Sequence, residues 1–218
     1  MEKSFAVIGL GRFGSAVARY LYQLDYDVMA IDQDEEKIQE HMNYVTHAVQ
    51  ADSTDEEAMK ALGIRNFDVV VVAIGEDIQA SILTTLILKE LGVPMLVVKA
   101  QNDQHGKVLD KIGADKVVYP EFDMGRRLAH SLISSNILDH IELAKDYSII
   151  EIRAPKEMVG KTLVQLDFRR RFGCYVMAMK QGKRFNIAPQ AEDLIHEGDI
   201  LVVLGHNQDL KKLEEFSQ

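Results

Sequence analysis

A glycine-rich stretch near the amino terminus, residues 5–14, constrains the fold of this chain more than any other segment. Four apolar residues lead into Gly9, Gly11 and Gly14, which form a Gly-x-Gly-x-x-Gly pattern, and apolar residues at helical spacing follow. This order predicts a buried strand, a tight turn and the start of a helix. Gly9 would allow the turn, Gly11 would let a pyrophosphate approach the backbone, and Gly14 would let the helix pack closely. The free N–H groups of the helix start would then bind phosphate.

The next apolar run supports a nucleotide site. Residues 28–32 read as a buried strand that ends in Asp32, about twenty residues after the glycine pattern, where a carboxylate can accept hydrogen bonds from ribose hydroxyls. Gln33 and Asp34 follow, and no Arg is present there to bind a 2′-phosphate, which disfavours NADP. Asp32 could also cap a helix over residues 35–42, a role that is compatible with a ribose contact.

Strand and helix patterns alternate as far as residue 121, which predicts an α/β fold with a doubly wound parallel sheet. Further strands are expected at 47–52, 68–75, 95–100 and 116–121. Helices are expected after a Thr54/Glu57 capping box, at 77–91 and at 103–112. The helix at 77–91 is apolar nearly all round, which is typical of a helix buried on two sides. We expect its second side to contact another subunit.

Ligands of doubly wound sheets bind at the carboxyl ends of the strands. Asp52 and Ser53 fall there, where an adenine would lie, although simple turn chemistry explains these residue types equally well. Gly75 and Glu76 end the next strand. These positions therefore extend the candidate site along the sheet edge.

Charged residues at this edge suit a polyphosphate as much as a dinucleotide. Arg12 lies inside the glycine pattern, and its guanidinium matches phosphate oxygens. Lys99 ends a strand, where it is either a solvated charge or a phosphate ligand, and Glu121 could bind a hard cation through its oxygens. Walker-type residues are missing, so we do not expect an efficient ATPase.

The pattern changes in the last third of the chain. An amphipathic helix is expected to about Asp139, and short strands follow at 147–153, 175–180, 184–187 and 200–204, with helices at 162–166 and 208–216. We therefore expect two domains, residues 1–140 and 141–218, the second a small α+β domain.

Composition excludes several classes of protein. The net charge of -9 makes a nucleic-acid partner improbable on electrostatic grounds. The single Cys174 excludes an internal disulfide framework and is expected to be a small buried residue in a reducing cytoplasm. No apolar run approaches the ~20 residues of a membrane span, and no signal-peptide pattern is present, so a membrane connection would run through a partner.

Catalytic chemistry is not evident. The second domain has no nucleophile motif and no HExxH, and we expect His105 and His196 to be solvated loop residues. A small NAD-dependent oxidoreductase remains an alternative because it would use the same glycine turn. A redox-sensing repressor is disfavoured by the acidity and by the lack of a helix-turn-helix pattern.

Taken together, these residues resemble the cytosolic regulatory subunits of bacterial Ktr potassium transporters, in the RCK (TrkA-N plus TrkA-C) family. The resemblance runs from end to end, and the segments that carry it are residues 5–14, 70–76, 78–81, 98–101, 112–115, 120–121, 166–169 and 197–201. It implies a Rossmann-like nucleotide-binding N-lobe, a small TrkA-C domain, and a regulatory protein that is not an enzyme.

The resemblance also implies partners and ligands. It implies a homo-octameric ring of four dimers in the cytoplasm, docked on a membrane-embedded potassium-translocating subunit at the inner face of the membrane. ATP and ADP would bind the N-lobe and give the ring different shapes, and NAD or NADH can occupy the same cleft in relatives. By position, the nucleotide would contact Gly9, Gly11, Arg12, Phe13, Gly14, Asp32, Gln33, Asp52, Ser53, Ala73, Ile74, Gly75, Glu76 and Lys99.

Two further roles follow from the resemblance. Arg12 would reach the γ-phosphate of ATP in the neighbouring subunit of a dimer, and Glu121 would help bind Mg²⁺ or Ca²⁺ there. Cyclic di-AMP would bind the small domain, where the matching positions are Val164, Arg169, Tyr175, Val176, Ala188 and Pro189. Tyr175 stands where relatives often have a small amide.

Overall fold

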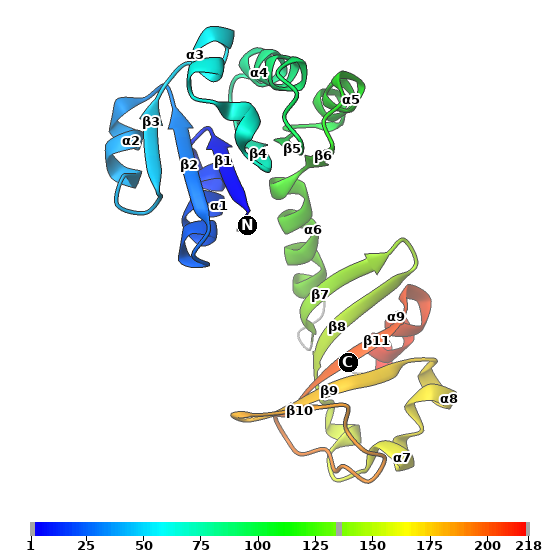
Figure 1. The fold of residues 1–218 in the computed structure, drawn as a ribbon. Helices are drawn as coiled ribbons and strands as arrows, with labels where there is room; N and C mark the ends of the chain where they lie inside the picture. The colour runs from blue at the N-terminus through cyan, green and yellow to red at the C-terminus, as the bar shows by residue number, and fades with distance from the viewer. Residues whose placement is uncertain (1–2, 134–136, 217–218) are drawn as a thin grey trace. The chain divides into compact units, whose positions relative to one another are not determined.

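The computed structural model describes residues 3–133 and 137–216, drawn as a ribbon in Figure 1. The chain divides into two compact units, Met1–Pro120 and Glu121–Gln218. The division falls after Pro120, whereas the sequence pattern changes near residue 140.

Unit 1 is built on a six-stranded parallel sheet with the strand order β3-β2-β1-β4-β5-β6 (Figure 1). This is the doubly wound arrangement that the alternating sequence predicts. Its strands are β1 (Ser4–Ile8), β2 (Asp27–Asp32), β3 (His47–Gln50), β4 (Val69–Val72), β5 (Leu96–Lys99) and β6 (Lys116–Val118).

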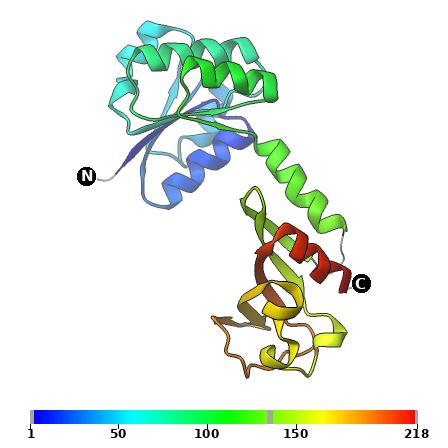
Figure 2. The same ribbon diagram turned by 90° about the vertical axis from the view of Figure 1, so that its right-hand side faces the viewer.

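Helices cover both faces of this sheet, as Figure 2 shows. Successive strand residues point to opposite faces, so each buried strand serves two cores. Val7, Val28 and Ala30 pack on the side of α1 (Arg12–Gln23) and α2 (Glu35–His41). Ala6 and Ile8 pack on the other side, in a core with residues of three further helices. These are α3 (Glu56–Ala61), α4 (Ile78–Glu90) and α5 (Asp103–Ile112), and a short 3₁₀ turn (Ile64–Asn66) joins the same core.

Unit 2 contains a five-stranded antiparallel sheet with the order β10-β9-β11-β8-β7. Its elements are α6 (Pro120–Ile133), which begins at the last residue of unit 1, β7 (Ile137–Ala144), β8 (Tyr147–Arg153), a 3₁₀ turn (Lys156–Met158), α7 (Leu163–Leu166), α8 (Phe168–Phe172), β9 (Tyr175–Gln181), β10 (Arg184–Ile187), β11 (Ile200–His206) and α9 (Asn207–Phe216). The α+β character of the second domain is confirmed.

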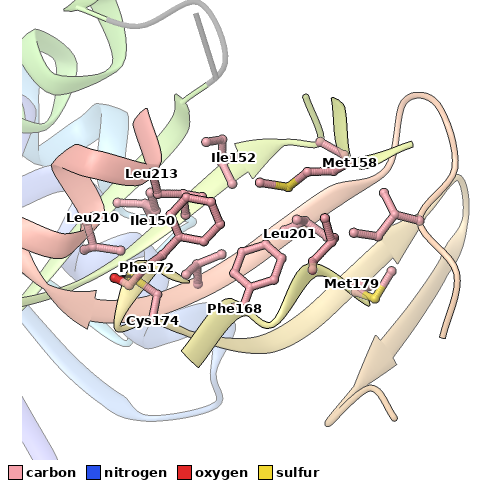
Figure 3. Close-up of a cluster of buried hydrophobic side chains, with 14 residues drawn as sticks. Ile150, Ile152, Met158, Phe168, Phe172, Cys174, Met179, Leu201, Leu210 and Leu213 are labelled. Atoms are coloured by element: carbon pink, nitrogen blue, oxygen red, sulfur yellow. Dashed lines mark hydrogen bonds between the residues drawn. The ribbon is translucent and has the colours of Figure 1, made fainter. Parts of the chain in front are cut away.

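The core of unit 2 lies between the sheet and helices α8 and α9. Figure 3 shows Ile150 and Leu201 of the sheet facing Phe168, Phe172 and other residues of the helices. Cys174 is fully buried in this cluster, and burial raises the pKa of its thiol to about 11. The expectation that this cysteine is a small core residue is confirmed.

Three expectations about the bounds and caps of β6, α6 and α3 are wrong. The sixth strand does not run to Glu121: it ends at Val118, and Pro120 begins α6, where a missing N–H costs nothing. The helix expected to about Asp139 is contradicted by β7, which pairs antiparallel with β8; residues 134–136 of that expectation lie outside the described residues. Asp55, and not Thr54, caps α3 by accepting from Glu57 N–H.

The longest described helix, α6, has 14 residues, and no described helix combines the length and the apolar composition needed to cross a membrane.

Helix α4 has an unusual distribution of side chains. Its buried face includes Ser81, Thr84 and Thr85, whereas Leu83 and Leu86 are each 41% exposed. Two leucines thus face outward, while three hydroxyl side chains share the buried face with Leu88. This arrangement agrees with the expectation that α4 contacts another subunit.

We predict that Leu83→Glu lowers the mass of the assembly measured by light scattering, because a carboxylate would be buried without a partner. Met95→Glu is the matched control, since Met95 is also 41% exposed but precedes β5. An unchanged mass for Leu83→Glu would contradict a role of α4 in assembly.

Candidate functional site

The glycine turn fixes the end of β1 against β4. Gly9 has φ +92°, a conformation that favours glycine, and a Cβ there would lie 3.0 Å from Ile74 N. Gly9 N–H donates to the Ile31 carbonyl at 2.8 Å, and Ala73 N–H donates to the Ile8 carbonyl at 2.7 Å. Three neighbouring strands are therefore joined at the point where the turn begins.

Gly14 and Gly11 have opposite surroundings. A Cβ on Gly14 would collide with the Gly9 carbonyl oxygen and lie 2.9 Å from Ala73 Cβ. A Cβ on Gly11 would meet no atom within 4 Å. Gly14 thus permits the close helix–strand packing predicted for it, and Gly11 leaves open space above the backbone.

The start of α1 is free to receive an anion. Gly11 is its N-cap residue and offers no side-chain cap, and no acidic residue lies in its first turn. The first N–H groups and the positive end of the helix dipole therefore have no anionic partner from these positions. Arg12 is the first helical residue; it is exposed and forms no ion pair with a described residue.

Asp32 ties the end of β2 to the glycine turn. Its Oδ2 accepts from Leu10 N–H at 2.6 Å, and its Oδ1 accepts from Asp34 N–H at 3.0 Å. Lys37 Nζ lies 3.5 Å from Oδ2. Asp32 is nearly buried, with 7% exposure, and it stands beside the turn as a ribose ligand would. The alternative that Asp32 caps α2 is wrong, because Asp34 accepts from Glu36 N–H and is the cap.

The two candidate residues that follow β3, Asp52 and Ser53, have different surroundings. Asp52 is exposed and accepts two hydrogen bonds from Thr54, which lower the pKa of Asp52. Asp52 therefore forms the hydrogen-bonded turn that was one of its two interpretations, the other being a contact with adenine. Ser53 is buried, and its hydroxyl lies 2.8 Å from the Thr84 hydroxyl of α4. Gln33 is exposed, and its carbonyl accepts from the Gln50 side chain.

Lys99 lies next to the glycine turn. It is 9% exposed, its ammonium is 5.9 Å from the centre of the Phe13 ring, and a Cβ on Gly75 would lie 3.3 Å from it. The structure thus brings Lys99, Phe13 and Gly75 together at the carboxyl edge. Around Gly75, Ala73 is buried, Ile74 is half-buried and Glu76 is exposed.

Glu121 has a different setting from the one expected. It lies in the first turn of α6, is exposed, and belongs to unit 2. The described residues include no group of three or more His, Cys, Asp or Glu side chains placed to hold a metal ion. A cation bound by Glu121 would therefore need ligands from outside that set.

The prediction for His105 is wrong and that for His196 is confirmed. His105 is 3% exposed, its Nδ1 accepts from Gln101 N–H at 3.3 Å, and burial lowers its pKa. The spacing of His105 and Leu109, four residues apart on α5, was a signal that both face the core. The His196 side chain is 63% exposed beside Asp199.

In unit 2, two of the predicted residues touch. The Arg169 guanidinium of α8 lies 4.7 Å from the centre of the Tyr175 ring, at the start of β9. Val164 is 60% exposed and Val176 is half-buried against the core. The last two residues follow β10: Ala188 has φ +55° and donates to the Met177 carbonyl, and Pro189 is half-buried.

Comparison with known proteins agrees with these two units. The family model of the TrkA-N domain matches residues 5–120, and that of the TrkA-C domain matches residues 147–218. The chain is 53% identical to Ktr system potassium uptake protein C of Bacillus subtilis, covering 99% of this chain and 97% of that one. It is 48% identical to Ktr system potassium uptake protein A of the same organism, covering 98% and 96%.

Solved structures of the GsuK channel have a similar fold. The channel bound to NAD is 24% identical with a TM-score of 0.53, covering 99% of this chain and 38% of that one. The form bound to ADP is 25% identical with a TM-score of 0.51, covering 60% and 34%. This chain therefore spans less than half of the channel chains.

We predict different consequences for two glycine substitutions. Gly14→Ala should lower the free energy of unfolding by about 1–3 kcal/mol, because α1 must move away from the Gly9 carbonyl. Gly11→Ala should lower it by less than about 1 kcal/mol but weaken nucleotide binding, because its methyl group fills the open space. Urea unfolding and calorimetry measure the two effects. Equal destabilisation by both substitutions would contradict the packing role of Gly14.

Proposed function

Because this chain belongs to the Ktr potassium-uptake branch of the TrkA-N and TrkA-C family, we propose that it switches a membrane-embedded potassium-translocating subunit in response to nucleotides. Relatives over the full chain are named Ktr system potassium uptake proteins, so the role that we propose is regulatory and not catalytic. The proposal concerns which ligands this chain binds and how their binding reaches the partner.

The uncapped start of α1 carries the nucleotide part of the proposal. It has open space over Gly11, an arginine at its first residue, and no acidic side chain in its first turn. A helix start of this kind binds phosphate through its N–H groups and its dipole. Asp32 would accept from a ribose hydroxyl beside the turn, and Lys99 would add a positive charge at the end of β5.

We assign ATP or ADP to this site, with NAD or NADH as further occupants. The GsuK channel, which shares the fold, has been solved with NAD and with ADP. The adenine would lie near Asp52 and Ser53, at the end of β3. Within a dimer, Glu121 would help bind a Mg²⁺ or Ca²⁺ ion at the nucleotide.

Arg12 supplies the difference between ATP and ADP in this proposal. A ligand shifts a conformational equilibrium only through different affinities for the two states. The Arg12 side chain is exposed and has no ion pair within its own described chain, so it is available to a phosphate bound by a neighbouring subunit. ADP lacks the γ-phosphate and would not engage Arg12 there.

The assembly in which this occurs is a ring of four dimers, docked at the cytoplasmic face of the membrane through the translocating subunit. The outward leucines of α4 support subunit contacts in unit 1. Two ring shapes, one favoured by ATP and the other by ADP, would then correspond to active and inactive transport.

Cyclic di-AMP is the ligand we propose for unit 2. Arg169 provides a cation for a phosphate, and its position over the Tyr175 ring holds the guanidinium in place. Val164, with 60% exposure, offers an apolar surface for a base. Tyr175 also presents a flat ring, so this chain would contact the ligand with an aromatic side chain where relatives often use an amide.

We predict that Arg12→Ala leaves ADP affinity nearly unchanged and weakens ATP affinity about tenfold to a hundredfold, because one charge-assisted contact is lost. Isothermal titration calorimetry on the full-length protein measures both. Arg19→Ala is the matched control on the same helix, since Arg19 stacks on Tyr44 and not on the site. An equal loss for ATP and ADP would contradict the γ-phosphate role.

We predict that Arg169→Ala abolishes cyclic di-AMP binding by calorimetry, whereas Arg170→Ala, an exposed neighbour on α8, preserves it. No heat with the unmodified protein would exclude this ligand. The mass of the purified protein and the identity of any nucleotide that copurifies with it provide an independent test of the whole proposal.

A further inference from the structure

A groove of about 610 Å³ lies at the end of the unit 1 sheet opposite to the glycine turn. Three segments line it: the end of α1, the start of β2 and the start of β3. Strand β2 relates the two places directly, because Asp27 begins it in the groove and Asp32 ends it at the glycine turn. Five steps of extended chain separate the Cα atoms of these two residues by about 16 Å. The groove is therefore distinct from the nucleotide site.

The groove is negatively charged. Asp25 and Asp27 are both exposed, and neither forms an ion pair with a described residue. Helix α1 ends beside them with no basic residue in its last turn, so the partial negative charge of the helix end adds to theirs. Each of these features favours a cation and opposes an anion.

Tyrosine rings complete the walls. Tyr22 is 41% exposed, and the Tyr26 ring packs edge-on against Phe5 with 5.2 Å between ring centres. The contact with Phe5 holds the Tyr26 ring in place. Tyrosine faces attract ammonium and guanidinium groups, and most strongly when carboxylates stand nearby. Two tyrosines, one of them held by Phe5, and two carboxylates without ion pairs among the described residues match the side chain of Lys or Arg.

We propose that this groove binds a Lys or Arg side chain on a cytoplasmic loop of the membrane-embedded translocating subunit, an inference that rests on the proposed function. Short cytoplasmic loops of membrane proteins carry an excess of Lys and Arg, so such a partner presents cations to a protein docked beneath it. The acidic chain, with a net charge of -9, would attract those loops over a distance. A second copy of this chain would bring like charges together, and anionic lipid headgroups would be repelled.

The test is the double variant Asp25→Asn plus Asp27→Asn in the full chain. It removes two charges at nearly constant volume, and Asn tolerates the φ of +64° at position 25. Affinity for the cognate membrane subunit, held in nanodiscs of zwitterionic lipid, should fall about tenfold or more. Affinity for ATP and ADP should be unchanged. Added NaCl should weaken binding of the unmodified protein more than that of the variant.

Two further variants make the result specific. Glu90→Gln plus Asp110→Asn removes the same charge from exposed positions on α4 and α5 and should stay within about twofold of the unmodified protein. His47→Lys places a cation in the groove from an exposed position and should weaken binding in the same direction as the double variant.

The outcomes separate this inference from the function on which it rests. If both groove variants fold and bind the membrane subunit as the unmodified protein does, the groove proposal is overturned while the proposed function stands. If the double variant loses mass in light scattering instead, the groove is a contact between copies and the proposal is again overturned. If the unmodified protein does not bind the membrane subunit, the proposed partner fails and this inference fails with it.

Discussion

The close approach of Gly14 to the Gly9 carbonyl oxygen is the contact on which the proposed phosphate site depends. Because no Cβ fits between them, α1 begins directly against the end of β1, and its first N–H groups lie beside the ends of the central strands. Asp32 then fixes the neighbouring strand to the same turn through Leu10 N–H. Steric exclusion thus defines the position of the proposed anion site through the backbone, and Arg12 and Lys99 would add positive charge to it.

Elements with local signals could be predicted from the sequence. Helix α5 has the predicted bounds, because the Asn102 cap and the left-handed Gly113 mark its two ends. Strand β7 was missed because its apolar residues continue the helical spacing of α6, and only pairing with β8 distinguishes the two. Such pairing is a contact between distant residues, which periodicity does not reveal. Helix α8 has five residues and no side-chain cap, so it gave no start signal.

The candidate site shows the same limit. The glycine positions were predictable because Gly9, Gly11 and Gly14 form one short local pattern, although the atoms that a Cβ on Gly9 would meet belong to Ala73 and Ile74. The partner of Asp32 was not, since Leu10 is 22 residues away. Residue types at the end of β3 predicted a polar edge but not that Ser53 turns inward to Thr84. The groove lined by Tyr22, Asp25 and Asp27 could not be predicted from the charges of the sequence. These residues come together only when α1 packs against β2.

The burial of Cys174 has a practical consequence. It is the single cysteine of the chain, it is fully buried, and its thiol stays protonated at neutral pH because its pKa is about 11. Electrophilic reagents that react with thiolates would therefore leave Cys174 of the folded protein unmodified. One cysteine placed on the surface would be the sole reactive thiol, so spin labels or fluorophores could report distances without first removing the native residue.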